Sequence, residues 1–179
     1  MQRVLSGPNQ LKRLFAALAE QTVAVDLGVA DPPLVDYLAE MLVRFVRIDA
    51  IFSARAVVAR RLDEVADMLL EAEQREQRPQ REVHRHIGDF TLFWTGVYPE
   101  ALRRLRSSDR KDALLDYQVQ GKRSYLIAST FDDAEFRAEA PVLRRLSEEF
   151  ELCSRGLARV RHEWERLPHT TPAWSADQN

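Results

Sequence analysis

Apolar residues recur at intervals of three and four along most of this chain, which is the spacing of one face of an α-helix. The pattern is densest in residues 82–100, EVHRHIGDFTLFWTGVYPE. A helix that is apolar nearly all round is buried among other helices, and residues 90–98 are almost entirely apolar. The pattern therefore predicts a central core helix over residues 82–97, whose apolar face carries Val83, Ile87, Phe90, Trp94 and Val97.

The same periodicity predicts helices on both sides of the central one. A first helix is expected over residues 8–22, and Asp31-Pro32-Pro33 supplies a cap and a first turn for a second, which ends near residues 47–52. Residues 23–29 are ambiguous, because their β-branched residues also suit a short extended piece, and Gly28 is a candidate helix stop. Further helices are expected over residues 53–72, 99–105, 110–130 and 142–167.

Linker and turn signals set the expected domain organisation. Residues 74–81 are polar and contain Pro79, so they form the best internal linker, at which the chain could divide into two halves. Residues 168–179 are polar apart from Ala173-Trp174 and are expected to be a disordered tail. No run of alternating apolar residues is flanked by turns as a strand would be. The pattern therefore predicts an all-α fold, a single-domain bundle of six or seven helices within residues 1–167.

Small residues predict where two of these helices meet. Gly121, Ser124 and Ala128 fall on one face of the helix expected over residues 110–130, where they permit close approach of two backbones. Gly88 and Gly96 each cost the central helix roughly 1 kcal/mol relative to alanine, a cost that a close helix contact could offset. We therefore expect these two helices to pack tightly against each other.

Composition and charge limit where such a bundle works. The chain has 179 residues and a formal net charge of -2, which argues against a general nucleic-acid binder. Its single cysteine, Cys153, cannot form an internal disulfide and fits the apolar stripe of the last helix. No apolar run approaches the roughly 18 residues of a membrane span, and the patch at residues 14–18 is too short for a signal peptide. We expect a cytoplasmic protein that does not contact membranes.

Three side chains of the central helix are candidate metal ligands: His84, His86 and Asp89. Imidazole and carboxylate groups bind zinc or iron, and His86 and Asp89 are spaced to share one helix face. His84 points away from that face, so one helix offers only a pair, whereas a catalytic site needs about three protein ligands. In the competing interpretation, one histidine lies at the surface and the other bonds to a neighbouring carboxylate.

A second candidate site lies on the helix expected over residues 110–130. Tyr117, Ser124 and Tyr125 could line a pocket for a small anionic ligand. Arg123 would then bind the carboxylate or phosphate of that ligand through two parallel hydrogen bonds. In the competing interpretation, the tyrosines are core residues with local hydrogen-bond partners and Arg123 is solvated.

A basic cluster surrounds the turn before that helix. It lacks the interleaved aromatic residues on which nucleic-acid bases stack, and Asp109 and Asp112 dilute its charge. A solvated surface turn accounts for it better than a nucleic-acid site. The cluster consists of Arg103, Arg104, Arg106, Arg110 and Lys111.

The motifs of common enzymes are absent from the sequence. It contains no Gly-rich phosphate loop, HExxH, GxSxG or CxxC, and it indicates no cofactor. The leading hypothesis is therefore a non-enzymatic interaction module that binds another protein or a second copy of itself. The alternative is a small-ligand-binding or metal-dependent helical enzyme whose site lies between the helix at 82–97 and the helix at 110–130.

Overall fold

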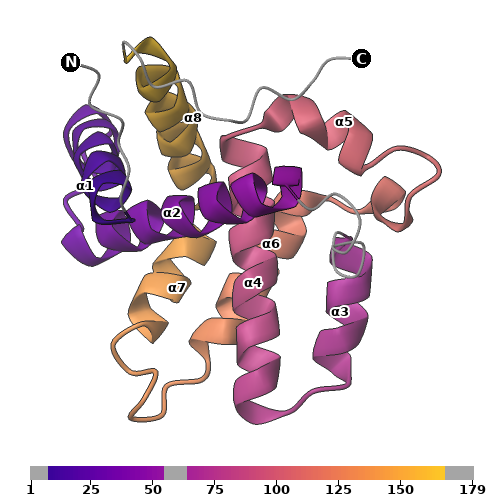
Figure 1. Cartoon of the computed structure of the whole chain (residues 1–179). Helices are drawn as coiled ribbons and strands as arrows, with labels where there is room; N and C mark the ends of the chain where they lie inside the picture. Colours follow the sequence, from indigo (N-terminus) through magenta and orange to yellow (C-terminus); the bar gives the residue numbers. More distant parts are fainter. Residues whose placement is uncertain (1–7, 55–63, 168–179) are drawn as a thin grey trace. The chain divides into compact units, whose positions relative to one another are not determined.

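The computed structural model describes residues 8–54 and 64–167, which form helices and turns without a strand. The predicted all-α fold is therefore confirmed. The tail expected at 168–179, and residues 55–63 of the helix expected over 53–72, lie outside the described residues. In chain order the elements are α1 (Pro8–Ala19), η1 (Glu20–Asp26), α2 (Pro32–Ala54), α3 (Val65–Glu73), α4 (Gln77–Gly96), η2 (Pro99–Ala101), α5 (Leu102–Leu105), η3 (Lys111–Leu114), α6 (Tyr117–Ser129), α7 (Ala140–Glu148) and α8 (Phe150–Arg166) (Figure 1).

The contacts of the chain divide it into two compact units. Unit 1 comprises residues 1–59 and 159–179, and unit 2 comprises residues 60–158. None of the helices in the described residues is both long and apolar enough to cross a membrane.

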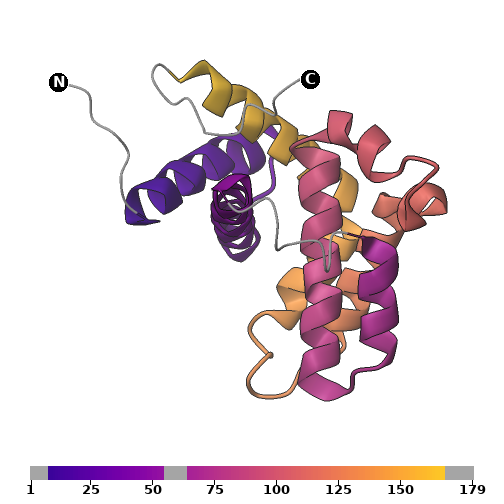
Figure 2. The same cartoon turned by 45° about the vertical axis from the view of Figure 1, so that its right-hand side comes forward.

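Unit 1 is built on α1 and α2, which pack against each other (Figure 2). Phe15 of α1 is fully buried, and its ring meets Trp164 edge to face with 4.4 Å between the ring centroids. Leu34 and Leu38 on α2 have no exposed surface and complete this core. The first two helices that the apolar pattern predicts are therefore confirmed.

The ambiguous segment at residues 23–29 is helical through Asp26. A π-helical segment, Glu20–Asp26, extends α1, and Val23 within it is buried. Gly28 then adopts a φ of +70°, a left-handed conformation that favours glycine, so the predicted stop is confirmed. At the start of α2 the Asp31 carboxylate accepts a hydrogen bond from the Leu34 amide at 3.2 Å, as a capping residue does.

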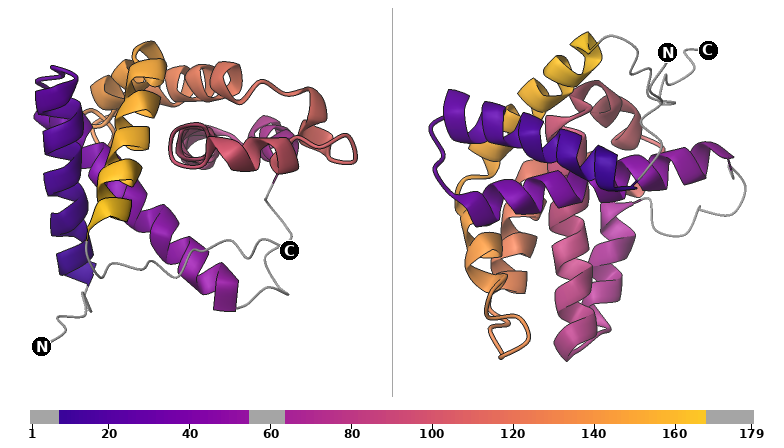
Figure 3. Two further views of the ribbon diagram at one scale, coloured as in Figure 1. Left: turned by 90° about the horizontal axis from the view of Figure 1, so that it is seen from above. Right: turned by 60° about the vertical axis from the view of Figure 1, so that its left-hand side comes forward.

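Unit 2 is organised around α4. Helix α4 packs on α3 and on α6, and α6 in turn packs on α7. Helices α3 and α4 lie side by side and run in opposite directions (Figure 3). Ile87 and Leu92 of α4 have no exposed surface, so the predicted central core helix is confirmed.

Four predicted helix boundaries were wrong. The helix expected over 53–72 begins in the described residues only at Val65, because Glu64 is extended, and residues 53 and 54 belong to α2. Helix α4 begins at Gln77 and not at residue 82. Pro79 lies in its first turn, where a proline is tolerated because the N–H groups there have no partner within the helix. The helix expected over 110–130 is interrupted at residues 115 and 116, both extended, and Asp116 caps α6 by accepting N–H bonds from Gln118 and Val119. The helix expected over 142–167 is divided at Glu149, between α7 and α8.

Candidate functional site

Helices α4 and α6 meet through two buried polar pairs. The Tyr125 hydroxyl donates a hydrogen bond to the Asp89 carboxylate at 2.8 Å, and both side chains are almost completely buried. Nearer the start of α4, the Nδ1 atom of His84 lies 3.4 Å from the Ser124 hydroxyl oxygen. An unpaired buried polar group is costly, so these pairs favour one register between the two helices.

Two glycines bring α4 and α6 into direct contact. A Cβ atom at Gly88 would lie 2.6 Å from the Tyr125 ring, and one at Gly121 would lie 2.3 Å from the Thr91 hydroxyl and 2.5 Å from the Phe150 ring. Real Cβ contacts are longer than these distances, so the helix backbones lie directly against neighbouring side chains. The predicted tight packing is confirmed, and it leaves no room for a ligand at these two points.

Alanine at Gly121 is expected to lower the free energy of unfolding by about 1–2 kcal/mol. Overpacking a core costs about 1–3 kcal/mol, which exceeds the roughly 1 kcal/mol that alanine gains in helix propensity. Gly88→Ala should have a similar effect. Gly96→Ala is the matched control, because its nearest neighbours would lie at 3.0 Å and need to move less. Urea unfolding measures all three, and a Gly121→Ala protein as stable as the wild type would contradict the prediction.

His84 is buried, and its surroundings disfavour its charged form. Burial lowers the pKa of the imidazole below its ordinary value, and the positive charge of Arg123 lowers it further. The unfolded chain, in which the pKa is about 6.5, therefore takes up a proton before the folded protein does. The contribution of His84 to stability is present at pH 7.5 and declines as the pH falls below about 6.5.

The wild type is expected to lose more stability between pH 7.5 and pH 5.5 than a His84→Gln variant. Urea unfolding at the two pH values measures this difference. His162→Gln, which changes an exposed histidine on α8, is the control, and its pH dependence is measured beside that of the wild type. Equal pH dependence in wild type and His84→Gln would show that His84 titrates normally in the folded state.

The three candidate metal ligands lie in different surroundings. His84 faces α6 in the interior, Asp89 is buried against Tyr125, and His86 is exposed. Among the described residues, 8–54 and 64–167, no three or more His, Cys, Asp or Glu side chains are grouped so that they could hold a metal ion. A metal role for these residues stays a prediction.

The four candidate ligand-binding residues do not gather on one side of α6. Tyr117, Ser124 and Tyr125 are buried, whereas Arg123 is exposed. The Tyr117 hydroxyl donates a hydrogen bond to Asp112 at 2.5 Å. Burial, reinforced by that carboxylate, raises the pKa of the Tyr117 hydroxyl far above its usual value, so the hydroxyl stays a donor at all ordinary pH values. A ligand-binding role for these four residues stays a prediction.

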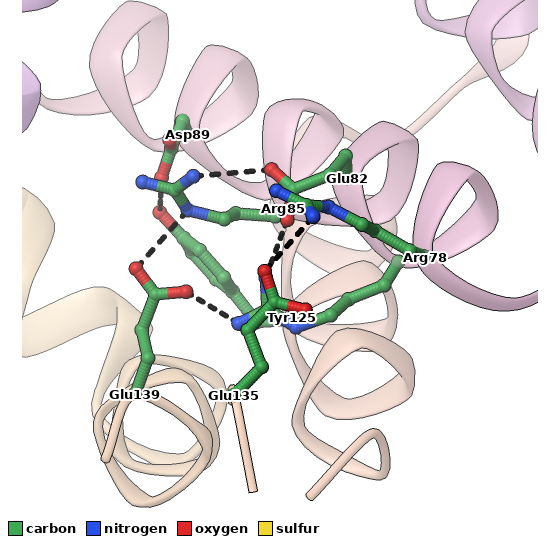
Figure 4. A network of polar contacts seen from close by, with 8 residues as sticks. Arg78, Glu82, Arg85, Asp89, Tyr125, Glu135 and Glu139 are labelled. Carbon is green, nitrogen blue, oxygen red and sulfur yellow. Dashed lines mark hydrogen bonds and ion pairs between the residues drawn. The ribbon is translucent and has the colours of Figure 1, made fainter. Parts of the chain in front are cut away.

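A cluster of arginines on α4 holds the connection between α6 and α7, and the sequence analysis did not identify it. The α4 arginine cluster consists of Arg78, Arg81 and Arg85, which face Glu135 and Glu139 (Figure 4). Arg81 is only 1% exposed, although its guanidinium is charged. These arginines are three and four residues apart, which is the spacing of a shared helix face. The sequence analysis placed Arg78 and Arg81 in the expected linker at residues 74–81, so this spacing was not recognised.

Arg81 contacts three groups at once. Its Nη1 atom donates to Glu82 at 2.6 Å, its Nη2 atom donates to Glu139, and its guanidinium carbon lies 4.0 Å from the centroid of the Phe136 ring. Its Nε atom has no hydrogen-bond partner. The carboxylates and the ring offset the cost of burying the charge and fix the connection at residues 131–139 to α4.

Asp112 is a second buried polar residue whose structural role the sequence analysis missed. Its carboxylate is completely buried and accepts hydrogen bonds from the Val65 and Ala66 amides, each at 2.8 Å. These amides open α3, where Glu64 in the capping position provides no side-chain bond. Asp112 therefore caps α3 from 47 residues away, and no pattern near it in the sequence indicates this role.

The basic cluster around residues 103–111 is partly neutralised by α3. Arg110 pairs with Glu64 at 3.3 Å, and Lys111 pairs with Asp67 at 2.7 Å. These two ion pairs therefore connect residues 110 and 111, which precede α6, to α3. The pairs support the structural interpretation of this cluster.

The outer side of α6 exposes apolar residues. Val119 and Leu126 are 55% and 47% exposed, and Leu114 in η3, just before the helix, is 96% exposed. Val119 and Leu126 are seven residues apart and so lie on one side of the helix, with the exposed Arg123 between them. We call Val119, Arg123 and Leu126 the α6 outer face.

Comparison of the chain with protein-family models, with curated proteins and with solved structures finds no match.

Proposed function

We propose that this protein is a non-enzymatic interaction module that binds another protein through the α6 outer face. The supporting observation is that α6 carries apolar residues on both of its sides. Its inner side packs on α4, whereas Val119 and Leu126 are open to solvent. Exposed apolar residues that share one side of a helix favour a contact surface there, so a partner would complete the burial of α6.

The charge on the α6 outer face favours a different protein over a second copy of this chain. In a symmetric pair, the middles of the two faces meet at the twofold axis. The two Arg123 side chains would then lie close together and repel each other. A partner helix with an acidic residue between two apolar residues fits this face, because it pairs with Arg123 and covers Val119 and Leu126.

Affinity enrichment from cells that make the protein tests this proposal. We expect the wild type to retain at least one protein that is lost with the double variant Val119→Ser, Leu126→Ser and with Arg123→Glu. Leu70→Ser is the control, since it removes an exposed apolar residue from α3 and should keep that protein. Substitutions at exposed sites change stability by only about 0.5 kcal/mol, so all variants should fold.

A purified partner should then bind the wild type and lose about tenfold or more in affinity for the double variant, since each buried apolar side chain contributes about 1 kcal/mol or more. The proposal fails if wild type and both face variants retain the same proteins. If the wild type is a dimer by native mass and the double variant is a monomer, the partner is a second copy of this chain. The proposed choice of a different protein is then wrong.

A further inference from the structure

Unit 1 contains a cleft that differs in chemistry from the α6 outer face. The cleft has a volume of about 380 Å³ and is bounded by the end of α1, by η1, by the turn before α2 and by the first turn of α2. Pockets that bind small molecules have volumes of about 300–1,000 Å³, so this cleft suits a ligand at the small end of that range. All of its lining residues belong to unit 1.

Three alanines make the cleft hollow. Ala16, Ala24 and Ala30 contribute only methyl groups to its lining, where larger side chains would fill the space. Ala16 and Ala24 lie four residues to either side of Glu20, and a spacing of four keeps successive residues on one side of a helical segment. The apolar part of the cleft therefore runs alongside the Glu20 side chain.

The charged residues that line the cleft, among those that the structure describes, are acidic. They are Glu20, Asp31 and Asp36, and none of the described lining residues is basic. Lys12 interacts electrostatically with Asp36, but its ammonium group is bound to Glu40 at 2.7 Å. Asp31 directs one carboxylate oxygen to the start of α2, so Glu20 and Asp36 are the carboxylates best placed to meet a ligand.

We propose that this cleft binds a small organic cation, an alkylguanidine or alkylamine. The hydrocarbon stem would lie against Ala16 and Ala24, and the cationic head would lie between Glu20 and Asp36. Both carboxylates are exposed, so each contributes modestly and the binding is sensitive to salt. This proposal concerns unit 1 alone and is independent of the interaction proposed for α6.

Titration of the ¹⁵N-labelled full chain with butylguanidinium, followed by NMR, tests the proposal. We expect saturable shifts of the Ala16, Ala24 and Ala30 amides at low salt, with a dissociation constant of roughly 1 mM. Asp36→Asn and Glu20→Gln should each weaken binding about threefold. Ala24→Leu fills the cleft without changing its charge and should abolish the saturable shifts. Glu73→Gln, at an exposed acidic residue of unit 2, is the control and should bind like the wild type.

Two further ligands complete the test. Butanol has the same stem without the charge, and an arginine tripeptide carries the same head group on a polypeptide. Butanol that binds as tightly as butylguanidinium would overturn the proposed role of the carboxylates. If butylguanidinium still binds the Ala24→Leu variant, the cation is attracted to the acidic surface in general. That result would overturn the proposal that the cleft is the binding site. Binding of the tripeptide alone would overturn the small-molecule form of the proposal.

Discussion

Replacing Asp112 by alanine is expected to lower the free energy of unfolding by about 3–4 kcal/mol. The substitution leaves the Val65 and Ala66 amides and the Tyr117 hydroxyl without their acceptor in the interior. A buried polar group that loses its partner costs about 1–3 kcal/mol, and three groups lose theirs here, although some relax toward water. The start of α3 also loses the negative charge that its dipole favours.

Asp116→Ala is the matched control for Asp112→Ala. Asp116 also caps a helix by accepting two amide hydrogen bonds, but its side chain is exposed, so its loss should cost only about 1 kcal/mol. Asp112→Asn keeps one carbonyl acceptor and should fall between the two. Urea unfolding monitored by circular dichroism gives all three values. Equal costs for the two alanine variants would show that burial adds nothing to the Asp112 cap.

Replacing Arg81 by alanine is expected to cost about 3 kcal/mol, the low end of what breaking a buried ion pair costs. Glu82 and Glu139 lose one of the two arginines that pair with them and keep only Arg85, and Phe136 loses the guanidinium that covers its ring. Because the two glutamates are 41% and 31% exposed, water can partly solvate them, which holds the cost at this lower end. Arg81→Lys keeps the positive charge, but an ammonium group lacks the two separate nitrogens with which a guanidinium binds two carboxylates. We therefore expect a loss of stability between those of the wild type and Arg81→Ala.

Arg78→Ala provides the comparison within the same cluster. Arg78 pairs with Glu135 at 2.9 Å, but both side chains are more than half exposed, and exposed pairs contribute about 0–1 kcal/mol. Hydrogen exchange of residues 131–139 should accelerate strongly in Arg81→Ala and little in Arg78→Ala. If the two variants exchange alike, Arg81 does not hold the connection between α6 and α7 in place.

The polar pairs between α4 and α6 show what the sequence could and could not predict about this helix contact. His84, Asp89, Ser124 and Tyr125 were all singled out as reactive residue types, and the structure brings them together in pairs. Each pair joins α4 to α6 across a contact between residues 36 or 40 positions apart in the sequence. Arg123, by contrast, is exposed on the other side of α6, since adjacent helical residues lie about 100° apart.

The two helix breaks that the sequence analysis missed, at residues 115–116 and at Glu149, were also hidden by the local pattern. An apolar pattern with a spacing of three and four continues through Glu149, so nothing in the periodicity marks the end of α7. At residues 115 and 116 the local signal existed, because aspartate is a favoured cap, but a helix beginning at 110 satisfied the same pattern. With the chain interrupted there, the Asp112 carboxylate lies against the Val65 and Ala66 amides of α3.

The sequence by itself determined the helical class, most of the helices and the stop at Gly28. These features are local, because apolar spacing, capping residues and backbone preferences act over a few residues. Only the tertiary structure decided that Asp112 caps α3, that Arg81 is buried, and that alanines leave a cleft in unit 1. Burial and long-range capping depend on which distant segments meet, and the energy of a polar group changes most when water is removed from it.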